Sequence, residues 1–109
     1  MNILGRNYEL NFEKTYNEMY RYGDFDQYKN IIRIANDIPE DEKIATVLHE
    51  IIEALNYYFE LNLEHPKIMS LEAGLFQVLK ENGVDLSVLL ENDEWKNIAF
   101  IQSKGDEHI

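Results

Sequence analysis

The fold and the chemistry of this chain both depend on one stretch, Thr46-Val47-Leu48-His49-Glu50-Ile51-Ile52-Glu53-Ala54-Leu55-Asn56. Its apolar residues recur every three or four positions, which is the spacing of one face of an α-helix. The same helix places His49 and Glu53, four residues apart, one above the other on a single face. Glu50 follows the histidine directly. The stretch therefore predicts an amphipathic helix that carries an imidazole and carboxylates close together.

Two helices and two strands are predicted around this stretch. The apolar periodicity extends the first helix over residues 40–61, after a block of acidic residues that suits a helix N-terminus. Pro66 suits the first turn of a second helix over residues 66–82. Alternating or β-branched residues predict strands over residues 2–12 and 28–36. We expect an α+β fold, in which a short antiparallel or mixed sheet packs on the long helix and on a second, antiparallel helix.

The second helix and the end of the chain supply further apolar residues. In the second helix, five residues are expected to face inward: Ile68, Leu71, Leu75, Val78 and Leu79. A short helical segment is expected over residues 84–90. Nearer the start of the chain, Gly23-Asp24 is a turn signal. Four residues are expected to dock the end of the chain onto the domain: Trp95, Ile98, Phe100 and Ile101. We expect one domain over residues 1–102 and a mobile tail over residues 103–109.

Composition excludes several classes of protein. The 109 residues suit one compact domain. The net charge of -11, from 21 acidic and 10 basic residues, argues against partners such as nucleic acid or an anionic membrane surface. Cysteine is missing, which excludes disulfides, thiolate nucleophiles and Cys-ligated zinc. No apolar run has the length of a membrane span or of a signal-peptide core, so we expect a cytoplasmic protein.

The histidines and acids of the two helices predict a metal centre. His49 and Glu53 supply two ligands from one rigid helix, and a third must come from later in the chain. His65, at the connection between the helices, completes the preferred set of two imidazoles and one carboxylate, and Glu72 is the alternative. Such a set suits Zn²⁺ and also Fe²⁺ or Mn²⁺. A competing interpretation is that His49 and Glu53 form only an exposed i, i+4 pair.

The order of strand, break and motif helix resembles the core of small zincin-like proteins of phages and prophages, of the minigluzincin type. Their sequence reads T-L-L-H-E-x-x-H-A, against Thr46-Val47-Leu48-His49-Glu50-Ile51-Ile52-Glu53-Ala54 in this chain. The likeness covers roughly residues 28–90. It implies that His49 is the first metal ligand and Glu50 the catalytic base. Glu53 stands where these proteins carry a second histidine, which weakens the expectation of peptidase activity.

Two functions follow as expectations. In the first, the chain is a divalent-metal-binding, metallopeptidase-like domain, and the strand over residues 31–35 is an edge strand that pairs with an extended peptide or protein. In the second, the chain is a metal-free relative of these proteins that acts as a protein-interaction module. The sequence does not define the substrate or the oligomeric state.

Overall fold

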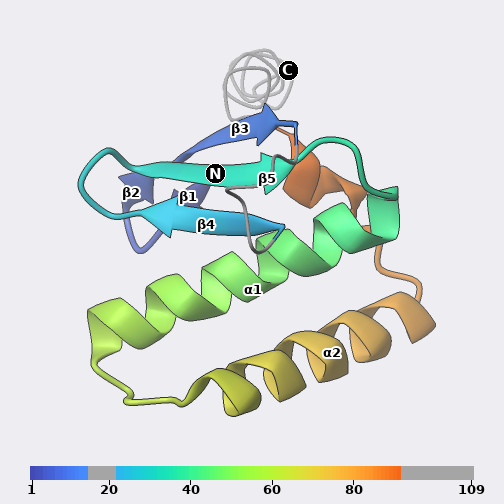
Figure 1. The fold of residues 1–109 in the computed structure, drawn as a ribbon. Helices are drawn as coiled ribbons and strands as arrows, with labels where there is room; N and C mark the ends of the chain where they lie inside the picture. Colours follow the sequence, from blue (N-terminus) through green and yellow to red (C-terminus); the bar gives the residue numbers. More distant parts are fainter. Residues whose placement is uncertain (15–21, 92–109) are drawn as a thin grey trace, which may run out of the picture.

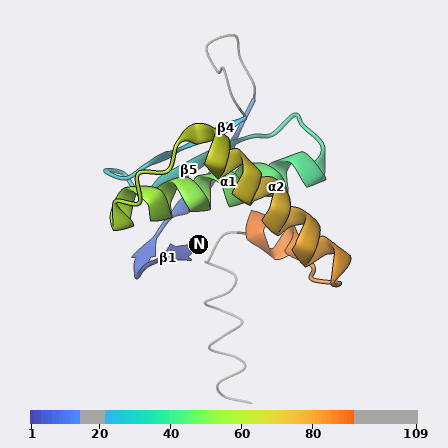
Figure 2. The same cartoon turned by 90° about the horizontal axis from the view of Figure 1, so that it is seen from below.

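The structure is a computed structural model, which describes residues 1–14 and 22–91. It has an α+β fold, as predicted, in which a long helix lies between a small sheet and a second helix (Figures 1 and 2). The elements are β1 (Asn2–Ile3), β2 (Arg6–Asn7), β3 (Glu9–Glu13), β4 (Gly23–Asp26), β5 (Ile31–Ala35), α1 (Glu40–Phe59), α2 (His65–Glu81) and the 3-10 helix η1 (Leu86–Leu90).

The main sheet is mixed, with the strand order β3-β5-β4. β3 runs parallel to β5, and β4 runs antiparallel to it. The prediction that residues 31–35 form an edge strand is therefore wrong, because β5 is the central strand. Ile32, Ile34 and Ala35 are completely buried, and β5 is paired on both sides, by β3 and by β4.

The edge strand on the side of α1 is β4. The sequence suggested a turn at Gly23-Asp24, but these two residues are the start of β4. Asp24 lies opposite Arg33 of β5, and its carboxylate accepts two hydrogen bonds from the Arg33 guanidinium, at 2.7 and 2.8 Å. These bonds raise the pKa of Arg33. A turn does follow β4, where the Asp26 carboxylate accepts hydrogen bonds from the backbone amides of Tyr28 and Lys29.

The N-terminal strand predicted over residues 2–12 is broken into three short strands. β1 and β2 form an antiparallel hairpin, and the two residues between them, Leu4 and Gly5, both have positive φ, 54° and 84°. Two such residues make the tight turn that matches the twist of a hairpin. The alternation that predicted one strand continues across this turn, so the break could not be read from it.

The two helices match their predicted ranges to within two residues and run antiparallel (Figure 1). Glu60 adopts the left-handed conformation that ends α1. The Asn56 side chain then accepts a hydrogen bond from the Leu63 amide at 2.9 Å, which fixes the connection. α2 begins at His65, one residue before the predicted start.

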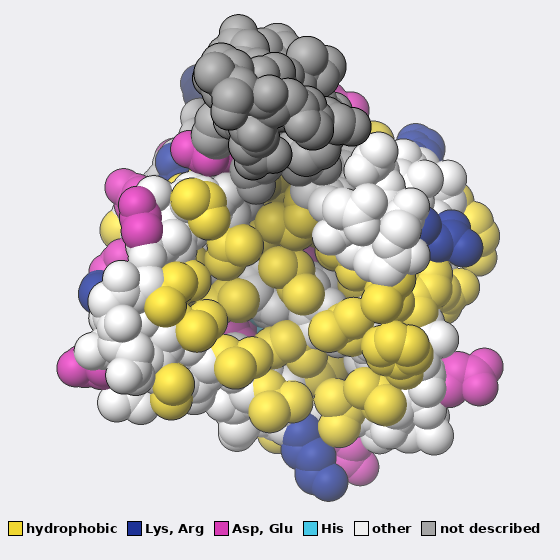
Figure 3. Space-filling view, turned by 180° about the vertical axis from the view of Figure 1, so that it is seen from behind, with side chains coloured by type: hydrophobic (Ala, Val, Ile, Leu, Met, Phe, Trp, Pro, Cys, Tyr) yellow, Lys and Arg dark blue, Asp and Glu magenta, His cyan; other side chains and the backbone are white. Residues whose placement is uncertain are grey.

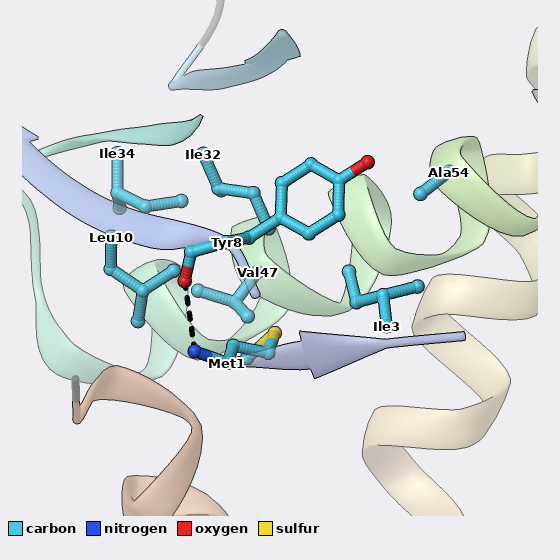
Figure 4. Packing of buried hydrophobic residues seen from close by; sticks show 8 residues of the cluster. All are labelled: Met1, Ile3, Tyr8, Leu10, Ile32, Ile34, Val47 and Ala54. Carbon is cyan, nitrogen blue, oxygen red and sulfur yellow. Dashed lines mark hydrogen bonds between the residues drawn. The ribbon is translucent and has the colours of Figure 1, made fainter. Parts of the chain in front are cut away.

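A cluster of buried side chains joins the N-terminal strands to β5 and α1 (Figure 4). Its members are Met1, Ile3, Tyr8, Leu10, Ile32, Ile34, Val47 and Ala54. Tyr8 is 1% exposed, and its hydroxyl is hydrogen-bonded to the hydroxyl of Tyr58 on α1. Burial of Tyr8, together with this contact, raises the pKa of its phenol to about 12.

Helix α2 is much less buried than the sequence predicted. Of the five residues expected to face inward, Ile68 is buried and Leu79 is half-buried. Leu71, Leu75 and Val78 are instead 45%, 43% and 54% exposed. Among the described residues, α2 is covered only on the side that faces α1. The apolar residues on its other side are therefore exposed to solvent.

Several remaining predictions concern the end of the chain. The helical segment expected over residues 84–90 is present as η1, over Leu86–Leu90. The docking residues of the segment 95–101 and the tail over residues 103–109 lie outside the described residues.

Within residues 1–14 and 22–91, no helix has the length and apolarity needed to cross a membrane.

Candidate metal centre

Three of the predicted ligands converge in the structure. His49 and Glu53 project from the middle of α1, and His65 is the first residue of α2. One ligand atom from each lies within 4.8 Å of the other two. Atoms bound to one zinc ion lie at most about 4.4 Å apart, because zinc–ligand bonds are about 2.0–2.2 Å long. Small side-chain rotations would therefore bring this donor set to coordination distance, and two imidazoles with a carboxylate suit a divalent metal.

The two nitrogens of His49 have different surroundings. Nδ1 lies 2.8 Å from Glu72 Oε1, whereas Nε2 lies 4.0 Å from Glu53 Oε1. The rings of His49 and His65 are 5.2 Å apart, edge to face. When Nδ1 carries the proton and donates it to Glu72, Nε2 keeps a free lone pair on the side of Glu53. In this tautomer Nε2, the nitrogen on the side of Glu53, is the one available to a metal.

Glu72 stands apart from the three converging groups. Its carboxylate sits at Nδ1, on the other side of the imidazole from Glu53. A carboxylate in that position fixes the tautomer and the orientation of a ligating histidine. Of the two alternatives for the third ligand, the structure brings His65 into the group and gives Glu72 the position of an orienting residue.

The predicted base, Glu50, is 2% exposed and lines a cleft of about 730 Å³. The cleft lies between α1, the start of α2 and the beginning of β4, and it includes His49, His65 and Glu72. A cavity of this size is in the range that holds a small molecule or a few residues of a peptide. Glu50 and two of the three candidate ligands, His49 and His65, therefore line one solvent-accessible space, whereas Glu53 is not among its lining residues.

Gly23, the first residue of β4, lines the cleft and allows β4 to approach α1 closely. A Cβ atom at Gly23 would lie 2.6 Å from Thr46 Cγ2 and 2.7 Å from the Arg33 carbonyl oxygen. Such distances are too short for any side chain. Glycine is therefore the residue that lets the edge strand lie directly over the motif helix.

Sequence reasoning missed the residues that complete this cleft, namely Tyr22, Gly23, Met69 and Phe76. The available signal was Gly23, since a glycine next to a strand often marks the close approach of another backbone. That glycine was interpreted as part of a turn. The pairing of β4 with β5, which brings Tyr22 and Gly23 to α1, could not be read from local periodicity.

No protein-family model, curated protein or solved structure matches the chain. The resemblance to zincin-like proteins stays a prediction from the motif.

Proposed function

We propose that this chain is a divalent-metal-binding domain that supports hydrolysis, with peptide bonds as the substrate class. The observation that carries the proposal is the convergence of His49, Glu53 and His65 from two helices within 4.8 Å. Zn²⁺ is the metal that this donor set suits best, and Mn²⁺ and Fe²⁺ are the alternatives. The cleft beside the three residues gives a substrate access to the centre.

Each residue of the centre has a distinct role in this proposal. His49 Nε2, the Glu53 carboxylate and His65 hold the metal, and Glu72 fixes the imidazole of His49 through Nδ1. When bound, the metal polarises a carbonyl oxygen and makes a nearby water a better nucleophile. Glu50 accepts the proton of the attacking water. Because Glu53 adds negative charge to the centre, we expect slower hydrolysis than a site with three neutral imidazoles would give.

The edge of β4 offers a place for a substrate backbone. β4 lies at the edge of the cleft, and in the part of the chain that the structure describes it pairs only with β5. An extended peptide could hydrogen-bond to its other side and thereby pass the metal centre. The expected peptide contact is therefore at β4, Gly23–Asp26, and not at residues 31–35.

The metal is tested by elemental analysis of protein purified without chelator. We expect close to one metal ion per chain and an increase in melting temperature when Zn²⁺ is added to the apo protein. His65→Ala should abolish both effects, since it removes an exposed ligand without disturbing the core. His108→Ala is the control, because it removes a histidine outside the proposed set. Protein that contains no metal and does not respond to Zn²⁺, Mn²⁺ or Fe²⁺ would refute the proposal.

Hydrolysis is tested separately with the metal-loaded protein and a mixture of fluorogenic peptides. Glu50→Gln should lower any observed turnover by about 10²-fold or more, because it removes the general base. The variant should keep its metal content, since Glu50 is not a ligand. Turnover that survives this substitution unchanged would show that Glu50 is not the base.

The second candidate function is a metal-free interaction module. The specific observation in its favour is the hydrogen bond from His49 to Glu72, which gives the imidazole a partner without a metal. In that case His49→Ala and Glu53→Ala should leave binding of a partner protein at β4 unchanged. Loss of that binding after chelation would instead assign the interaction to the metal form.

A further inference from the structure

The apolar stripe of α1 is incompletely covered by the described residues. Val47 and Ala54 belong to the buried cluster under the sheet, and Leu48 and Ile52 are also buried. Ile51 and Leu55 lie between these positions on the helical wheel and should therefore be the most protected. Both are nevertheless only half-buried. Some apolar cover is missing along the middle of the stripe.

Helix α2 adds exposed apolar residues on its side away from the cleft. Glu72 and Phe76 line the cleft, so the helical spacing turns Leu71, Leu75 and Val78 away from it. These three residues are 43–54% exposed. Seen from behind, the molecule gathers hydrophobic side chains around a hollow (Figure 3). We call the residues Ile51, Leu55, Leu71, Leu75 and Val78 the rear apolar face.

An apolar face of this extent needs an occupant, because exposed apolar surface is unfavourable at about 25 cal/mol per Å². The described chain ends at Glu91, directly after η1, whose Leu89 and Leu90 pack against the edge of the buried cluster. The following residues include a dense apolar group, which consists of Trp95, Ile98, Phe100 and Ile101. We propose that the segment over residues 95–104 is the occupant of the rear apolar face.

Chain length permits this contact. Ile101 lies ten positions after Glu91, and an extended chain over ten positions reaches about 33–36 Å. The stripe from Leu71 to Val78 on α2 is only about 10 Å long. Because the segment is tethered to η1, its effective concentration at the face is in the millimolar range, well above that of a free partner.

Charge also favours this segment over a second copy of the chain. The segment over residues 95–104 contains two lysines, Lys96 and Lys104, and no acidic residue, in a chain of net charge -11. Docking therefore places Lys96 and Lys104 on an acidic body, with the acidic pairs Asp93-Glu94 and Asp106-Glu107 outside the docked segment. Pairing of two copies would bring two bodies of charge -11 together, which opposes association.

Trp95 makes the proposal directly measurable, because it is the only tryptophan in the chain. In the full-length protein we expect blue-shifted tryptophan emission and several-fold weaker quenching by acrylamide than in the urea-unfolded chain. The double variant Leu71→Ser/Leu75→Ser should shift the emission to the red and restore most of the quenching. Ala73→Ser/Gln77→Ser is the control, since it introduces serine at the same spacing on the opposite side of α2.

A second measurement does not depend on the folding of a destabilised variant. Because the chain has no cysteine, a nitroxide label can be placed at one introduced cysteine. A label at Val78→Cys should quench Trp95 several-fold more than a label at Gln77→Cys. Equal quenching from the two labels, or wild-type acrylamide quenching equal to that of the unfolded chain, would overturn the proposal. So would protection of Trp95 that disappears on dilution, together with dimers in sedimentation, since a second copy would then be the occupant.

Discussion

At the scale of single residues, the proposed metal centre depends on how His49 is held. His49 is 9% exposed, and Glu72 and Glu53 lie near opposite nitrogens of its ring. A free histidine would sample both tautomers and several ring orientations. When Glu72 accepts the hydrogen bond from Nδ1, Nε2 keeps its lone pair available on the side of Glu53.

We predict that Glu72→Ala weakens zinc binding by about 10–100-fold, as expected for loss of a group that orients a ligating histidine. Glu72→Gln should have a smaller effect, because its amide oxygen can still accept the hydrogen bond from Nδ1. Competition titration against a chromophoric chelator measures both affinities, and Glu81→Ala on the same helix is the control. Complete loss of stoichiometric metal in both variants would instead identify Glu72 as a ligand.

Tyr8 gives the fold a defined sensitivity to high pH. Its pKa is raised from 10.0 to about 12 in the folded protein, chiefly by burial. The unfolded chain therefore releases this proton first, and stability falls as the pH rises from 10 to 12, by about 2–3 kcal/mol in total. Below pH 10 both states keep the proton, so this contribution is fully present there.

Urea unfolding at several pH values checks this prediction. In Tyr8→Phe the loss of stability between pH 10 and 12 should be smaller by about 2–3 kcal/mol, because the group that titrates is gone. Tyr28→Phe is the control, since that side chain is 86% exposed. The same pH dependence in Tyr8→Phe and in the wild type would contradict the assignment.

At the scale of elements, the position of β4 decides the shape of the cleft. Gly23 allows the strand to contact α1 at Thr46, and the Arg33–Asp24 pair holds the strand to β5. The position of β4 is thus set by its backbone pairing with β5, by the close contact of Gly23 with Thr46, and by one ion pair. Any residue that forces β4 away from α1 would also open the wall of the cleft.

We predict that Gly23→Ala lowers the free energy of unfolding by about 1–3 kcal/mol, the usual range for overpacking a tight contact. The introduced Cβ meets the Arg33 carbonyl oxygen, which cannot rotate away. Gly74→Ala is the matched control in α2, where a Cβ meets no atom within 4 Å. The free energy of unfolding of that control should rise by about 0.5–1 kcal/mol. Denaturant unfolding of both variants measures these free energies. An unchanged free energy of unfolding in Gly23→Ala would show that β4 can move.

The secondary structure was predicted best where a long periodic pattern carried it. Both helices were placed to within two residues, because a stripe of apolar residues at helical spacing extends over many turns. The strands were predicted less well. Leu4 and Gly5 interrupt an alternation that looks continuous, and the central place of β5 depends on its parallel pairing with β3, which is distant in sequence.

At the scale of the whole molecule, the candidate site was only partly accessible to sequence reasoning. His49 and Glu53 followed from helical spacing, and His65 followed from the short connection between two antiparallel helices. The contribution of Glu72 could not be assigned, because a ligand and an orienting group have the same spacing. The wall of the cleft was missed because Tyr22 reaches α1 only through the β4–β5 pairing.

The central position of α1 has a further consequence for how the protein can vary. Eight of its 20 residues are buried, whereas α2 buries only Ile68. α1 meets the sheet, α2, the cleft and the rear apolar face on different sides, so nearly every direction around its axis is constrained. Random substitutions should therefore be tolerated far more often in α2 than in α1. A library that aims to change the surface of this protein without unfolding it should begin on the solvent side of α2.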